Sequence, residues 1–261
     1  MGKVACFIFI ILSIGLLLGC KMETTVFYNT KLFVWKGRRE SCLILIHGGK
    51  ACSERAREIG ERFSDYFYPQ YTIIAVDYRF SGYGGGELED ILNAISYAKH
   101  LLIKKVFLIG ESHGGYLALL GATKAEVSGV IDAYGPTDLL AMQSFANSQN
   151  PQLNKDWADY IQATQKECQD TRLELTECIK KRSPYYLADK IKAPVLLLHG
   201  TEDNIVPISQ SEMLAKRFKQ LGKTNYRFVA LKGLGHGFSL LEGQPFELIQ
   251  NFLNKLRGEP S

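Results

Sequence analysis

The sequence lacks several features that mark whole classes of protein. Its 31 basic and 27 acidic residues leave a formal charge of +4, but no long run of Lys or Arg forms a stripe, so no nucleic-acid partner is expected. No group of Cys and His has zinc-like spacing, and no cofactor or metal is expected. Internal repeats and low-complexity tracts are absent as well. What remains is a globular chain of 261 residues, long enough for one domain with a substantial core.

The N-terminus differs from the rest of the chain. Lys3 precedes an almost wholly apolar run from Val4 to Leu18, which is shorter than the roughly 20 residues of a spanning helix and typical of a signal peptide. The segment Leu17-Leu18-Gly19-Cys20 resembles the lipobox of bacterial lipoproteins. That resemblance implies a signal peptide over residues 1–19 and an exported lipoprotein of the bacterial cell envelope, anchored to a membrane only through Cys20. An uncleaved anchor, or an ordinary signal peptide with a chance Cys, is the alternative.

Export would expose the four later cysteines to oxidation. Cys42 begins a predicted strand and Cys52 lies beyond its far end, so the two should be about 15 Å apart. A disulfide requires Cα atoms within about 7 Å, which excludes this pair. Cys168 and Cys178 would be equally distant on one continuous helix, but the Thr-x-x-Glu spacing of Thr171–Glu174 predicts a capping box that starts a new helix. The sequence alone does not decide whether Cys168 and Cys178 form a disulfide.

Strand-like apolar runs alternate with helical patterns through the rest of the chain. This alternation predicts an α/β fold, with a mostly parallel, doubly wound sheet covered by helices on both faces. An edge hairpin that turns at Asn29-Thr30 is expected first. The expected strands are 26–28, 32–35, 43–46, 72–76, 105–109, 128–134, 195–198 and 226–231, and the expected helices are 53–66, 88–102, 114–122, 208–221 and 245–256.

The alternation is interrupted once, after the sixth strand. The segment from Pro136 to Tyr186 is polar and largely helical and has no strand signal. We therefore expect a small helical cap at about residues 136–186, inserted into a domain that spans residues 20–261. Its aromatic residues either line an apolar pocket or pack the cap onto the body of the domain. They are Phe145, Trp157, Tyr160, Tyr185 and Tyr186.

The segment Gly110-Glu111-Ser112-His113-Gly114 lies between an apolar strand and a helix, which is the context of a nucleophile elbow. A sharp strand-to-helix turn strains the backbone of the central Ser, and only small residues two before and two after it avoid a clash. Gly110 and Gly114 occupy those places. The pattern predicts that Ser112 is a catalytic nucleophile exposed at the carboxyl edge of the sheet.

A serine hydroxyl needs an adjacent base whose tautomer is fixed by a carboxylate. In this fold the expected chain order is Ser, acid, His. His236, on the glycine-rich loop after the last strand, fits the base. The other histidines fit packing, loop-fixing or helical positions better: His47, His100, His113 and His199.

Asp203 fits the acid, because it lies where the chain leaves a buried strand at the same edge of the sheet. Glu202 and Asp138 remain alternatives, and either could be a helix cap or a solvated carboxylate.

Two backbone N–H groups should bind the oxyanion of the reaction. One belongs to His113, at the start of the helix after the nucleophile. The second is expected from the segment His47-Gly48-Gly49-Lys50, where Gly49 is favoured over Lys50. The alternative is that these glycines only turn the chain.

With these residues in place, the sequence from Leu43 to Leu256 resembles the α/β-hydrolases. Within that fold it is most similar to the catalytic domain of the prolyl oligopeptidase and acylaminoacyl-peptidase group and to related esterases. The resemblance implies a triad of Ser112, Asp203 and His236. The most specific motifs are Gly110–Gly115, Ser183–Tyr186, Lys192–Asp203 with Val206-Pro207, and Gly235–Phe238.

The sequence departs from the family pattern in two places. Fewer than thirty residues precede the first expected strand, so no N-terminal propeller is expected, and Lys50 replaces the third glycine of the His-Gly-Gly-Gly run of some esterases. A small-molecule carboxylic ester is therefore the expected substrate of a serine hydrolase, with a short peptide or amide as the alternative. A non-catalytic binding protein on the same fold is a third hypothesis.

Overall fold

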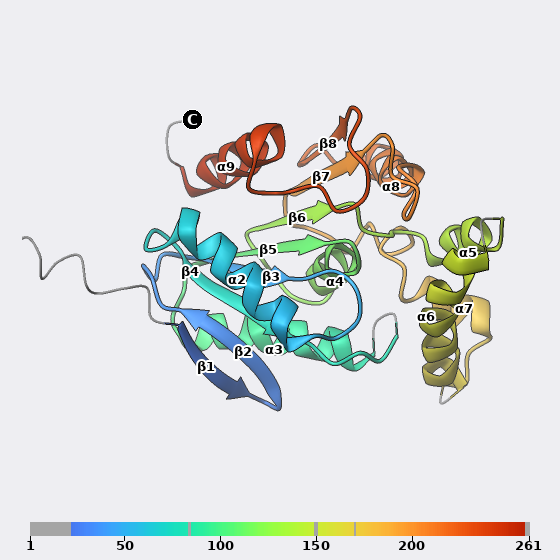
Figure 1. Cartoon of the computed structure of the whole chain (residues 1–261), viewed down its shortest axis with the longest axis horizontal. Helices are drawn as coiled ribbons and strands as arrows, with labels where there is room; N and C mark the ends of the chain where they lie inside the picture. Colours follow the sequence, from blue (N-terminus) through green and yellow to red (C-terminus); the bar gives the residue numbers. More distant parts are fainter. Residues whose placement is uncertain (1–21, 83–84, 149–150, 170, 259–261) are drawn as a thin grey trace, which may run out of the picture.

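A central sheet organises the computed structural model, which describes residues 22–82, 85–148, 151–169 and 171–258. The described residues form eight strands in the order β1-β2-β4-β3-β5-β6-β7-β8, with helices on both faces (Figure 1). All pairs from β4 to β8 are parallel, while β1 and β2 add antiparallel at one edge. The strands are β1 Met22–Phe27, β2 Thr30–Trp35, β3 Ser41–Ile46, β4 Thr72–Asp77, β5 Lys105–Glu111, β6 Gly129–Ala133, β7 Val195–Gly200 and β8 Tyr226–Leu231. This confirms the predicted fold class.

The central strands are continuous apolar runs because both of their faces are covered. Every residue of β3 and β7 is buried, as expected for strands of a parallel sheet between two helical layers. On one face, β-strand side chains pack against α2 and α9; on the other, they pack against α3, α4 and α8. These helices are α2 Ser53–Phe67, α3 Gly86–His100, α4 His113–Ala122, α8 Ser209–Gln220 and α9 Gly243–Arg257.

The edge hairpin is present, but its predicted turn is wrong by one residue. Tyr28 and Asn29 make the turn, both with positive φ (46° and 67°), the conformation of the tight turns that match strand twist. Thr30 instead begins β2 and is buried, because its hydroxyl donates to Asp90 Oδ1 at 2.6 Å. A hydrogen bond to the helix that contains Asp90, α3, therefore stabilises this register of the hairpin.

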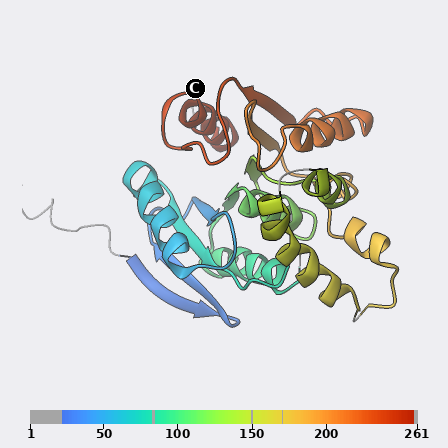
Figure 2. The same ribbon diagram turned by 45° about the vertical axis from the view of Figure 1, so that its right-hand side comes forward.

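The cap follows β6, as predicted, and consists of α5 Leu139–Ser148, α6 Pro151–Gln169 and α7 Leu175–Lys180. It lies beyond the carboxyl ends of the parallel strands (Figures 1 and 2). A Cβ atom on Gly82 would overlap Ala163 of α6, so the body and cap backbones approach closely there. Among the described helices, none is long and apolar enough to cross a membrane. The predicted signal peptide and Cys20 lie outside the described residues.

A disulfide joins Cys168, near the end of α6, to Cys178 in α7, with Cα atoms 6.0 Å apart. The chain turns between them, as the bridge requires, but the predicted capping box is wrong. Thr171 donates its hydroxyl to Cys168 O, and the N-cap of α7 is Glu174, which makes no side-chain cap bond. Cys42 and Cys52 are free, as expected.

Replacing Cys168 and Cys178 together by Ser should destabilise the protein. The bridge closes a loop with a sequence separation of 10, and constraining such a loop contributes about 2 to 3 kcal/mol, or a Tm change of roughly 5 to 10 °C. Thermal unfolding with and without dithiothreitol checks this. Reductant should lower the Tm of the wild type and of a Cys52→Ser control but leave the double variant unchanged; equal Tm values in all samples would contradict the prediction.

Candidate active site

Ser112 lies at a sharp turn between β5 and α4. Its backbone adopts φ 53° and ψ −118°, a strained conformation for a residue with a Cβ atom. A Cβ on Gly110 would overlap Gly114 O, and a Cβ on Gly114 would overlap Ile46 O. Both flanking positions therefore require glycine, for the steric reason that the sequence motif indicates.

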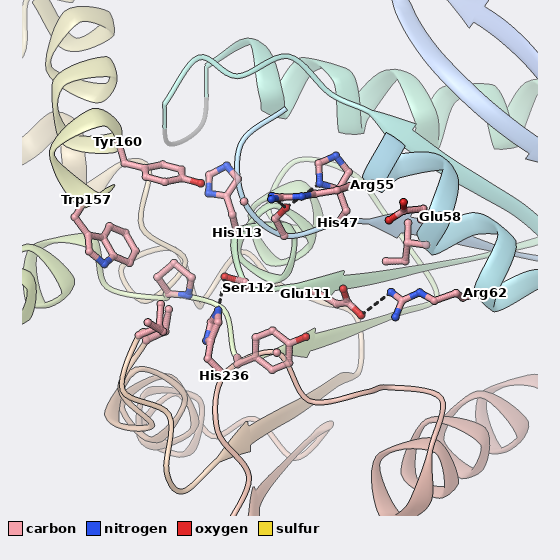
Figure 3. Close-up of a pocket in the computed structure, with 18 residues that line it drawn as sticks. His47, Arg55, Glu58, Arg62, Glu111, Ser112, His113, Trp157, Tyr160 and His236 are labelled. Atoms are coloured by element: carbon pink, nitrogen blue, oxygen red, sulfur yellow. Dashed lines mark hydrogen bonds and ion pairs between the residues drawn. The ribbon is translucent and has the colours of Figure 1, made fainter. Parts of the chain in front are cut away.

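The three residues predicted as a triad meet at the carboxyl edge of the sheet. His236 Nε2 lies 3.0 Å from Ser112 Oγ (Figure 3). His236 Nδ1 lies 2.7 Å from Asp203 Oδ2. Both contacts are satisfied when Nδ1–H donates to the carboxylate and Nε2 accepts from the serine hydroxyl. The three side chains come from the loops after β7 and β8 and from the turn after β5, so the parallel sheet itself brings them together.

Asp203 is held as an anion by several donors. Burial raises the pKa of its carboxyl, but hydrogen bonds from His199, His236 and the Val206 N–H outweigh burial and hold the pKa well below its usual range. The N–H groups of Ile205 and Val206 donate to Oδ1, each at 2.9 Å. These donors therefore favour the charged carboxylate over the neutral acid.

The alternative acids occupy other places. Asp138 Oδ1 accepts the N–H groups of Leu140 and Ala141 at the start of α5, which makes it a helix cap. Glu202 is exposed to solvent. Neither carboxylate contacts His236 in the described structure, whereas Asp203 does.

Three of the other histidines are held away from the serine hydroxyl. His199 is fully buried, with Nδ1 2.7 Å from Ser211 Oγ and Nε2 2.8 Å from Val206 O. Burial lowers the pKa of His47 to about 4, so that its ring stays neutral where it stacks on Tyr78. The ring of His113 contacts the buried carboxylate of Glu87 at 3.1 Å.

The loop predicted to bind the oxyanion lies against the nucleophile. A Cβ atom on Gly48 would be 3.2 Å from Ser112 Cβ, and Gly49 has φ +76°. The Tyr78 hydroxyl lies 2.6 Å from Gly49 O and 3.0 Å from His47 O, which fixes the loop from behind. His113 is the first residue of α4, where backbone N–H groups have no partner within the helix. The loop and the helix start therefore flank Ser112 from two sides.

A cavity of about 440 Å³ opens onto Ser112 and has two unlike walls (Figure 3). Trp157 and Tyr160 of the cap form an aromatic wall; of the five predicted aromatics, only these two are among the described residues that line the cavity. Arg55, Glu58 and Arg62 of α2 line the other side. No sequence motif marks these charged residues, although their spacing places them on one face of the helix.

The described residues contain no group of three or more His, Cys, Asp or Glu that could hold a metal ion. The arrangement is suited to acyl transfer: a nucleophile, a base, an orienting carboxylate and a backbone site for a developing oxyanion.

The fold and this site define an α/β-hydrolase. A family model confirms the class and gives the family: the BD-FAE model matches residues 35–218, and the chain belongs to the BD-FAE family.

Individual relatives are esterases and peptidases. The chain is 28% identical over 189 residues to dipeptidyl aminopeptidase BIII of Pseudoxanthomonas mexicana, a match that covers 65% of this chain and 26% of the relative. It is 22% identical over 196 residues to esterase LipC of Mycobacterium tuberculosis, covering 66% and 46%. The truncated form of a carbohydrate esterase from gut microbiota has the same fold, with a TM-score of 0.69 at 21% identity over 92% of this chain and 97% of that one. The match spans less than half of either curated relative.

Asp132 is a fully buried acid beneath the nucleophile elbow, and its ionisation should make stability depend on pH. Burial raises the pKa of Asp132 from 3.8 to about 7, against the lowering effects of His199 and of the Gly135 N–H. Oδ1 accepts that N–H at 3.0 Å, while Oδ2 has no hydrogen-bond partner among the described residues. Because burial raises the folded-state pKa, the Asp132 carboxyl contributes fully to the stability of the folded protein below about pH 4. This contribution is lost as the pH rises through about 7.

Asp132→Asn should remove this pH-dependent decrease in stability. The free energy of unfolding of the variant, minus that of the wild type, should increase between pH 4 and pH 8 by at most about 4 kcal/mol. Urea unfolding at four pH values measures the difference, from which the other titrating groups cancel. Parallel stability curves for the two proteins would show that Asp132 ionises normally.

Proposed function

We propose that this chain hydrolyses a carboxylic ester through an acyl-enzyme on Ser112. The observation that supports the proposal best is the continuous contact from Ser112 Oγ through the His236 ring to Asp203 Oδ2. A serine hydroxyl at a plain structural turn has no need of a base, and a histidine on a solvent-facing loop has no need of a buried carboxylate.

In the first half of the reaction, His236 Nε2 takes the proton of Ser112 while Oγ attacks the ester carbonyl carbon. The carbonyl oxygen becomes an oxyanion next to the His113 N–H and the Gly49 loop, where preorganised donors stabilise it. Asp203 stabilises the imidazolium through its contact with Nδ1. His236 then donates the proton to the departing alkoxide, which leaves as the alcohol.

In the second half, His236 takes a proton from water, and the hydroxide oxygen attacks the acyl carbon. The bond to Ser112 breaks, Oγ regains its proton from His236, and the carboxylic acid leaves. No group outside the described site is needed to balance either half.

A short peptide or amide is the second candidate substrate. The similarity to dipeptidyl aminopeptidase BIII favours it, and the same acyl-enzyme chemistry would cleave an amide. The similarity to esterase LipC favours the ester. A cavity of about 440 Å³ admits a small substrate of either kind.

Hydrolysis of p-nitrophenyl esters from acetate to palmitate, beside aminoacyl and prolyl p-nitroanilides, tests this function. Ser112→Ala and His236→Ala should each lower kcat by about 10⁶-fold, and Asp203→Asn by about 10⁴-fold. Glu202→Gln is the matched control and should retain full activity, because this neighbouring carboxylate is exposed. Dominant anilide turnover would assign a peptidase, and no turnover of either class would favour a binding protein.

We further propose that the protein is exported and anchored by lipid at Cys20. The support is the short apolar run from Val4 to Leu18 and the lipobox-like Leu17-Leu18-Gly19-Cys20. Two acyl chains are enough to hold a folded domain stably on a membrane.

Cys20→Ser should abolish incorporation of labelled fatty acid into the protein. Cys52→Ser, in the body of the domain, is the control and should still incorporate the label. A wild-type protein that is membrane-associated but carries no label would identify an uncleaved anchor instead.

A further inference from the structure

The charged wall of the cavity contains two arginines whose guanidinium groups have different partners. Arg55 and Arg62 both project from α2 toward the cavity (Figure 3). Arg62 Nη2 lies 3.5 Å from Oε1 of Glu111, the last residue of β5 and the neighbour of Ser112. Arg55 Nη1 instead donates to Gly48 O at 3.3 Å, and no carboxylate of the described residues is within ion-pair distance, 4.0 Å, of Arg55. Its charge is therefore not neutralised by a neighbouring carboxylate.

Arg55 is also close to the reacting atoms. A Cβ atom on Gly49 would overlap its guanidinium group, so the guanidinium lies directly against the oxyanion loop. In the same loop, a Cβ atom added to Gly48 would lie 3.2 Å from Ser112 Cβ, so the loop backbone passes close to the nucleophile. A substrate whose carbonyl carbon lies at Ser112 Oγ thus places its neighbouring atoms within reach of Arg55.

A guanidinium group offers five N–H donors in a planar fork that matches a carboxylate. Arg55 uses one of these donors on Gly48 O, and its side chain lines the cavity. On the same helix, Glu58 also lines the cavity one turn farther along. A negative group at Glu58 repels a second anion, which confines an anionic substrate group to the end of the wall beside Gly49.

We propose that Arg55 forms an anion-binding subsite, and that the ester substrate bears a carboxylate near the scissile bond. This inference rests on the proposed esterase function and adds its substrate class: a half-ester of a dicarboxylic acid, or an ester whose alcohol part carries the carboxylate. Arg55 acts on specificity, since the triad performs the same chemistry on a neutral ester.

The test compares charged and neutral esters of matched shape. For the acyl side, mono-p-nitrophenyl glutarate is paired with p-nitrophenyl pentanoate; for the leaving group, 4-acetoxybenzoate is paired with phenyl acetate. Each pair gives a ratio of kcat/KM, charged over neutral, which cancels changes that affect both substrates. The pair whose ratio depends on Arg55 identifies the side of the ester that carries the carboxylate.

Three variants on one helix predict three different outcomes. Arg55→Gln should lower the ratio roughly tenfold in at least one pair, as expected for loss of a charge-assisted hydrogen bond. Glu58→Gln should raise the ratio in the same pair. Arg57→Gln is the control and should leave the ratio unchanged, because Arg57 is exposed, pairs with Glu61 at 3.4 Å and is not among the residues that line the cavity.

Salt gives an independent readout. Raising the ionic strength should lower the wild-type ratio, because screening weakens attraction between exposed charges, and should have little effect on the ratio of Arg55→Gln. Unchanged ratios in Arg55→Gln for both pairs would overturn the anion subsite. Absence of turnover of every ester by the wild type would instead overturn the proposed function, so the two failures are distinguishable.

Discussion

The strained backbone of Ser112 is the constraint on which the site depends. Its φ of 53° persists because the surrounding hydrogen bonds determine the conformation: the Ser112 N–H donates to Ala133 O at 2.8 Å, and Ser112 O accepts the Tyr116 N–H at 3.1 Å. Strain of this kind costs about 1 to 3 kcal/mol and survives only in a rigid setting. The setting here is a fully buried helix, α4, packed between the sheet and α3. Packing of the core therefore holds Ser112 at the cavity, where its hydroxyl meets His236.

The parallel sheet then determines where the partners of Ser112 come from. The strands β5, β6, β7 and β8 are neighbours and run in the same direction, so the loops at their carboxyl ends converge at one edge. Asp203 is fixed there by backbone N–H groups and by His199, whose own ring is anchored to Ser211. Asp203 in turn orients His236, which lies on the glycine-rich loop after β8.

The sequence predicts the parts of this structure that follow from local rules. The order of strands and helices, the elbow glycines and the loops of Asp203 and His236 follow from periodicity, sterics and chain order. The turn at Tyr28-Asn29 does not, because the burial of Thr30 against Asp90 selects the register. The capping-box prediction failed for a similar reason: the disulfide, together with the bond from Thr171 to Cys168 O, decides how the chain turns.

The charged face of α2 was also invisible in the sequence. Arg55, Glu58 and Arg62 have the spacing of an ordinary solvated helix face, and only the tertiary structure shows that this face borders the cavity. The pattern of charges shows which residues share a face of the helix. The packing of Ala56, Ile59 and Phe63, on the other face of α2, against the sheet decides where the charged face points.

The same distinction between packing and surface charge applies to the cap. Lys50, at the place of the third glycine, forms an ion pair with Asp159 of α6 and lies over the ring of Phe80, which in turn contacts Tyr160. Exposed pairs of this kind contribute about 0 to 1 kcal/mol. Apolar packing on the inner side of the cap contributes more stability than this ion pair, because Leu139, Met142 and Trp157 belong to the same buried cluster as α3 and α4. Core packing, more than the ion pair, therefore holds the aromatic wall of the cavity opposite the charged wall of α2.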